Sequence, residues 1–123
     1  MKANYSEFHK ETLGRIGNYS KANPKLMEAF SKLHHVGSMP GALSTKEKEL
    51  IALGISITSR CEGCIAMHTQ DALNSGATSA EIIETIGTAI YMGGGPAVVY
   101  GAKAFEMLNE FKANKKYQMI NNN

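Results

Sequence analysis

The sequence predicts an all-α protein of about five or six helices. Apolar residues recur at spacings of three and four along most of the 123-residue chain, which is the period of an amphipathic helix. Helix-capping residues precede several of these segments, and no segment alternates apolar and polar residues for long enough to predict a strand. The length suits one domain with a hydrophobic core of its own.

The first two expected helices differ in how clearly they are marked. The opening segment SEFHKETLGRI has the weakest helical pattern. Asn23 can cap the next helix, which has Pro24 at its first position and is expected to stop at Gly37. The apolar residues of that second helix recur at helical spacing: Leu26, Phe30 and Leu33.

A capping box marks the third helix. Ser44 is followed three residues later by Glu47, so each side chain can accept a hydrogen bond from the backbone of the other. The apolar face of this helix is expected to consist of Leu50, Leu53, Gly54 and Ile57. A fourth helix is expected over about residues 61–74 and stops at Gly76.

A second capping box, Thr78 with Glu81, opens the fifth helix. Its isoleucines are expected on one side: Ile82, Ile83, Ile86 and Ile90. GGGP ends it, and Pro96 starts a last helix. The residues expected to face inward there are Val98, Ala102, Phe105 and Leu108. The helical glycines Gly54, Gly87 and Gly101 predict close helix approach, and residues 115–123 are expected to be a flexible tail.

The composition is that of an ordinary globular protein. Hydrophobic residues make up 43% of the chain and charged residues 20%, which excludes an intrinsically disordered chain. The net charge is +2, and the cluster Lys112, Lys115 and Lys116 is expected to be solvated rather than to bind nucleic acid. Without a recognisable signal peptide or membrane-spanning run, we expect a cytoplasmic protein. In a reducing compartment, a C-x-x-C pair favours catalysis or metal binding over a structural disulfide.

The segment SRCEGCIAMHTQ contains both cysteines of the chain, Cys61 and Cys64, with His68 four residues after the second. One interpretation is a zinc site, but structural zinc sites normally have four ligands. The chain has no second cysteine pair, and His34 and His35 are adjacent instead of being separated by several residues. A site made of these two cysteines, His68 and a distant carboxylate remains an alternative with less support.

A second interpretation is a reactive dithiol. In a helix that begins near Cys61, offsets of three and seven residues place Cys61, Cys64 and His68 on one face. The helix dipole favours a thiolate at Cys61, whereas the histidine one turn below favours deprotonation of Cys64. The pair can close a disulfide, although the absence of expected strands argues against a thioredoxin fold. A third interpretation, in which the cysteines are only small buried residues, is left open by the spacing.

The surrounding sequence resembles a known family. The run EKELIALGISITSRCEGCIAMHTQDALNSGATSAEIIETIGTAIYMGGGPAVVYGAKAFEML is similar to the core of the AhpD-like alkylhydroperoxidase branch of the carboxymuconolactone decarboxylase family, over about residues 36–108. The pattern that carries the resemblance is Glu49, followed after twelve residues by the C-x-x-C of Cys61 and Cys64, and then by His68. The segment LNSGATSAEIIET resembles the family's usual join between two helices.

The resemblance implies an AhpD-like helical domain over residues 1–123, with thiol-dependent peroxidase activity. It implies that Cys64 attacks the peroxide and becomes a sulfenic acid, and that Cys61 resolves it as a disulfide. It further implies that Glu49 and His68 form a proton relay. No cofactor is expected beyond this dithiol. The expected partners are a peroxide, a lipoyl-type or thioredoxin-like electron donor, and further copies of the chain in a homotrimer or homohexamer, with no nucleic acid and no membrane.

One departure and three alternatives accompany the resemblance. Some family members have a histidine immediately before the second cysteine, where this chain has Gly63, which puts efficient peroxidase activity in question. The alternatives are a lyase of the carboxymuconolactone decarboxylase type, a general dithiol disulfide reductase, and a non-enzymatic helical scaffold or metal-binding module. The first of these is not expected to depend on a C-x-x-C.

Overall fold

A computed structural model describes residues 4–114, and within them the chain forms six α-helices and no strand. The helices are α1 (Tyr5–Ala22), α2 (Pro24–Ser38), α3 (Thr45–Thr58), α4 (Glu62–Asn74), α5 (Ser79–Gly93) and α6 (Gly95–Ala113). The all-α prediction is confirmed. The expected tail, 115–123, lies outside the described residues. None of the helices in 4–114 combines the length and the apolar character needed to cross a bilayer.

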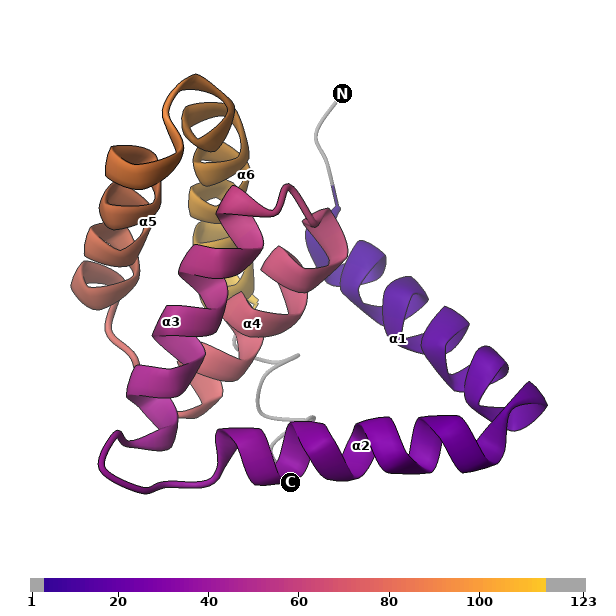
Figure 1. Cartoon of the computed structure of the whole chain (residues 1–123). Helices are drawn as coiled ribbons and strands as arrows, with labels where there is room; N and C mark the ends of the chain where they lie inside the picture. Colours follow the sequence, from indigo (N-terminus) through magenta and orange to yellow (C-terminus); the bar gives the residue numbers. More distant parts are fainter. Residues whose placement is uncertain (1–3, 115–123) are drawn as a thin grey trace.

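The last four helices form a bundle that contains the core (Figure 1). α3 packs against α4, α5 and α6, and α6 also packs against α4 and α5. The largest fully buried apolar side chains come from all four of these helices: Leu53, Ile57, Ile65, Ile82, Met107, Leu108 and Phe111. Burial of one such side chain contributes about 1.5–3 kcal/mol to folding. Because α3 and α4 both bury side chains in this core and pack on each other, the core fixes their relative positions.

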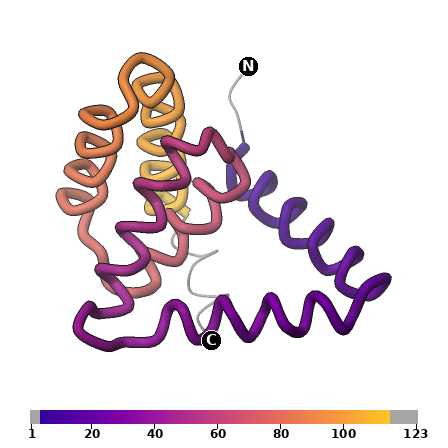
Figure 2. The backbone as a smooth tube through the Cα atoms, in the orientation of Figure 1, coloured from indigo at the N-terminus to yellow at the C-terminus, as the bar shows by residue number. Residues whose placement is uncertain are grey.

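The first two helices extend away from the bundle, and Figure 2 shows the chain leaving along α1 and returning along α2. The start of α1 is attached to α6, because the backbone N–H groups of Tyr5 and Ser6 donate to the Glu110 carboxylate at 3.0 and 2.6 Å. No residue of α2 is buried. Its expected apolar stripe is present but faces outward in the single chain, with Phe30 56% exposed and Leu33 66% exposed.

Both expected capping boxes are confirmed. The Glu47 N–H donates to Ser44 Oγ at 3.1 Å, and the Ser44 N–H donates to Glu47 Oε1 at 2.9 Å. Thr78 and Glu81 form the same pair of bonds at the start of α5. Lys46 of α3 also donates to Glu81 at 2.9 Å and holds the pKa of that carboxyl below its ordinary value. The starts of α3 and α5 are therefore joined.

The predicted inward face of α6 is largely wrong. Leu108 is buried, but Val98 and Phe105 are 50% and 45% exposed, and Ala102 is exposed as well. The residues that α6 buries are Ala97, Gly101, Ala104, Met107, Leu108 and Phe111. The small residues on this face let α6 approach the bundle closely. Val98, Ala102 and Phe105 instead line an outer groove together with Ile83, which is 47% exposed.

Close approach of helices is confirmed at Gly101 but not at Gly87. A Cβ atom on Gly101 would lie 2.9 Å from Ile86 Cγ2, whereas a Cβ on Gly87 would meet no atom within 4 Å. We expect Gly101→Ala to lower the free energy of unfolding by about 1–3 kcal/mol through overpacking. The matched control Gly87→Ala should raise it by about 0.5–1 kcal/mol, because alanine is the better helix former. Urea unfolding followed by circular dichroism measures both, and equal changes would contradict close packing at Gly101.

Candidate functional site

The two cysteines lie at the start of α4 and are joined as a disulfide, with their Cα atoms 5.2 Å apart. Helix α4 spans Glu62–Asn74, which confirms the helix expected over about residues 61–74. Cys61 is the N-cap, and its sulfur takes the place of the usual side-chain oxygen by accepting the Cys64 N–H at 3.2 Å. Both cysteines are partly exposed.

A sharp turn connects the end of α3 to Cys61. Arg60 has a φ of 57°, a left-handed conformation that costs energy for a residue with a side chain. The turn is held by backbone bonds from the Arg60 N–H to the Ile57 carbonyl and from the Cys61 N–H to the Ser56 carbonyl, both 3.1 Å. The position of Cys61 is therefore fixed by α3 as well as by α4.

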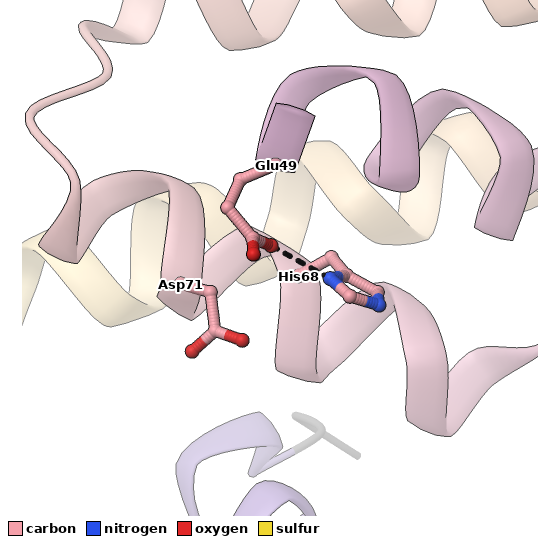
Figure 3. A group of neighbouring side chains, drawn as sticks. All are labelled: Glu49, His68 and Asp71. Atoms are coloured by element: carbon pink, nitrogen blue, oxygen red, sulfur yellow. Dashed lines mark hydrogen bonds and ion pairs between the residues drawn. The ribbon is translucent and has the colours of Figure 1, made fainter. Parts of the chain in front are cut away.

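Glu49 and His68 meet across the contact between α3 and α4. His68 Nδ1 lies 2.8 Å from Glu49 Oε2, and Figure 3 shows the carboxylate directed at the ring. Glu49 is buried, with 6% of its side chain exposed, against 19% for His68. The hydrogen bond to Glu49 raises the pKa of His68 above its ordinary value, against the opposing effect of burial. A proton on Nδ1 is donated to the carboxylate, which leaves Nε2 of the neutral ring as a proton acceptor.

Asp71 and His34 also lie at this site. The sequence predicted neither of them here, and His34 was considered only as a zinc ligand of unsuitable spacing. Asp71 follows His68 by one turn on α4, and burial followed by the charge of Glu49 raises the pKa of Asp71. The spacing of three residues from His68 could have identified it. The ring of His34, on α2, stacks on the ring of His68 with centroids 6.3 Å apart. No sequence spacing predicts that contact, because it depends on how α2 returns to the bundle.

Gly63 lies between the two cysteines and has a structural explanation. A Cβ atom at this position would lie 3.2 Å from Thr12 Cγ2 of α1, which is closer than ordinary packing allows. Helix α1 therefore occupies the space into which a larger side chain at Gly63 would extend. In this chain, a histidine at position 63 would require α1 to shift away from α4 at Thr12.

The structure thus joins the four predicted residues in two bonded pairs. Cys61 and Cys64 form one pair, and Glu49 with His68 forms the other. Because His68 follows Cys64 by four residues on α4, the pairs are one helical turn apart. Such an arrangement can exchange two electrons at sulfur and move a proton between an imidazole and a buried carboxylate.

Similarity to known proteins was found at the level of both sequence and structure. Residues 24–107 match the family model described as the carboxymuconolactone decarboxylase family. An uncharacterised protein of Cupriavidus necator is 32% identical over 112 residues, covering 89% of this chain and 96% of its own. An uncharacterised protein from the cox locus of Paracoccus denitrificans is 35% identical, over 77% of this chain and 86% of its own.

Two solved structures are similar throughout most of the fold. A carboxymuconolactone decarboxylase family protein from Legionella pneumophila is 40% identical with a TM-score of 0.84, covering 87% of this chain and 96% of its own. A protein of the same family from Thermotoga maritima, with a suggested role in an antioxidative response, is 31% identical with a TM-score of 0.69. It covers 74% of this chain and 94% of its own.

Proposed function

Because the chain belongs to the carboxymuconolactone decarboxylase family, we propose that it is a thiol-dependent peroxidase of the AhpD type. The observation that carries the proposal is a disulfide between Cys61 and Cys64 on the same helix that places His68 against Glu49. A dithiol that closes into a disulfide can deliver two electrons, which is the number needed to reduce a peroxide. The role suggested for the Thermotoga relative is of the same kind.

The first step is attack by the Cys64 thiolate on a peroxide oxygen. A sulfur–oxygen bond forms, the oxygen–oxygen bond breaks, and the alcohol leaves after taking up a proton, so that Cys64 becomes a sulfenic acid. His68 follows Cys64 by one turn, and its Nε2 can accept the thiol proton and return it to the leaving oxygen. Glu49 is proposed to hold the ring in the tautomer that this transfer requires.

The second step closes the disulfide. The Cys61 thiol attacks the Cys64 sulfur, the sulfur–sulfur bond forms, and the hydroxyl leaves as water with the Cys61 proton. The position of Cys61 suits this role, because its sulfur already lies against the backbone N–H of Cys64 at 3.2 Å. A dithiol donor, of lipoyl or thioredoxin-like type, then reduces the disulfide and is itself oxidised.

We also propose that the chain acts as a homo-oligomer, a homotrimer or a homohexamer. Helix α2 buries none of its residues in the single chain and exposes an apolar stripe. A further apolar pocket of about 390 Å³ lies between α3 and α5, with Leu50, Ile51, Ile55 and Met92 among its lining residues. Exposed apolar surfaces of this extent are typical of subunit interfaces.

Mass spectrometry with thiol labelling tests the proposed redox cycle. We expect the reduced protein to take two labels and the peroxide-treated protein to take none, with a mass loss of two hydrogens for the Cys61–Cys64 disulfide. Partial labelling of the reduced protein should modify Cys64 first, since it is the proposed thiolate. The peroxidase proposal would be contradicted if the protein still takes two labels after treatment with alkyl hydroperoxide or with hydrogen peroxide.

A further inference from the structure

Two carboxylates and an imidazole lie close together where α3 and α4 meet. They belong to Glu49, His68 and Asp71, each of which offers a ligand atom within 4.8 Å of the others. We propose that these three side chains form a binding site for Zn²⁺ or a similar divalent transition-metal ion. The proposed redox cycle does not require such an ion, so the site would be an additional property of the chain.

The geometry suits a three-ligand site with an open position. Zinc bound by histidine nitrogen and carboxylate oxygen at 2.0–2.2 Å in a tetrahedral arrangement places its ligand atoms about 3.3 Å apart. In this protein one pair of candidate atoms, His68 Nδ1 and Glu49 Oε2, is already 2.8 Å apart. Figure 3 shows Asp71 beside that pair, on the same helix as His68. All three candidate atoms lie within 4.8 Å of one another, so the Asp71 carboxylate has to move toward the pair for the three groups to surround one ion.

The electrostatics favour a cation at this point. Glu49 is buried and Asp71 is partly buried, so the two carboxyl groups have little water to screen their repulsion. A divalent ion would neutralise both carboxylates at once, whereas a single proton on His68 compensates one of them. The mixed nitrogen and oxygen ligands suit zinc better than calcium or magnesium, which prefer oxygen alone.

Zinc binding at this site can be distinguished from zinc binding by the cysteines when the protein is oxidised. Thiolates are strong zinc ligands, but in the disulfide form both sulfurs are bonded to each other. Any stoichiometric binding to the oxidised chain therefore has to use other side chains. An ion at this site would also occupy the atoms of the relay and block it. That consequence rests on the proposed function, whereas the binding itself does not.

Competition with a coloured zinc chelator tests the site on the full-length oxidised protein. We expect one Zn²⁺ per chain for the wild type and at least a tenfold weaker affinity for Asp71→Asn, which removes one ligand oxygen at almost unchanged volume. Asp71→Glu, which retains a carboxylate, should keep most of the affinity. The matched control is Glu84→Gln on α5, where an exposed carboxylate is removed and zinc binding should not change.

Two outcomes overturn the site: a wild type that binds no stoichiometric zinc, or an Asp71→Asn variant that binds as tightly as the wild type. Circular dichroism of each variant shows whether the helices are retained, and Asp71→Glu provides the comparison should Asp71→Asn unfold. Neither readout involves peroxide. The two proposals are therefore tested independently: a protein without peroxidase activity can still bind zinc, and a protein that binds no zinc can still be a peroxidase.

Discussion

Cys64→Ser is expected to abolish peroxide-dependent oxidation of a dithiol donor, with a loss in rate on the order of 10³-fold or more. The serine hydroxyl is a far weaker acid than a thiol and cannot form a sulfenic acid, so the first step of the proposed cycle has no nucleophile. The fold should be unaffected, because position 64 is partly exposed in the first turn of α4. Stopped-flow measurement of donor oxidation with alkyl hydroperoxide gives the rate.

Cys61→Ser is the matched control for that experiment. Serine is among the best N-cap residues, so this variant should keep the start of α4 while removing the resolving sulfur. We expect it to react once with peroxide and stop at a Cys64 sulfenic acid, which a dione reagent traps for mass spectrometry. Wild-type turnover in both single variants would refute the redox proposal. Lactone decarboxylation that survives replacement of both cysteines by alanine would support the lyase alternative instead.

Glu49→Gln is expected to lower the rate of peroxide-driven disulfide formation on the order of 10²-fold. Glutamine preserves the volume and can still accept a hydrogen bond from His68, but it removes the negative charge. That charge supports the bond that raises the pKa of His68, so the ring becomes a weaker proton acceptor. Rapid-quench labelling of the reduced protein after a peroxide pulse measures this step without any electron donor.

The control for Glu49→Gln is Glu84→Gln, in which the same exchange is made at an exposed position of α5. It should oxidise at the wild-type rate. Thermal unfolding of both variants separates a loss of chemistry from a loss of structure. Unchanged disulfide formation in a folded Glu49→Gln protein would remove Glu49 from the relay and leave its hydrogen bond to His68 a structural contact.

The local features of this protein could be predicted from sequence because each depends on residues a few positions apart. Ser44 with Glu47 and Thr78 with Glu81 bond within one turn, so their capping boxes are visible in the residue order. The same holds for the spacing of Cys61, Cys64 and His68 along α4. Glu49 is different, since it became a site candidate only through the resemblance to a family. In the structure its carboxylate lies 2.8 Å from His68 Nδ1, and the relay role stays a prediction.

The tertiary structure decided which of two apolar faces is buried, and which side chains meet across helices. In its first three turns, α6 has larger apolar residues on one side, such as Val98 and Phe105, and small residues on the other, and periodicity favours the larger side as the core. The bundle instead buries Ala97, Gly101 and Ala104, because small residues permit the closest helix approach. Likewise His34 reaches His68 only through the path of α2, and Thr12 closes the space at Gly63 only through the packing of α1. Sequence determines interactions that close within a turn, whereas contacts between helices depend on packing angles and distances that no local spacing encodes.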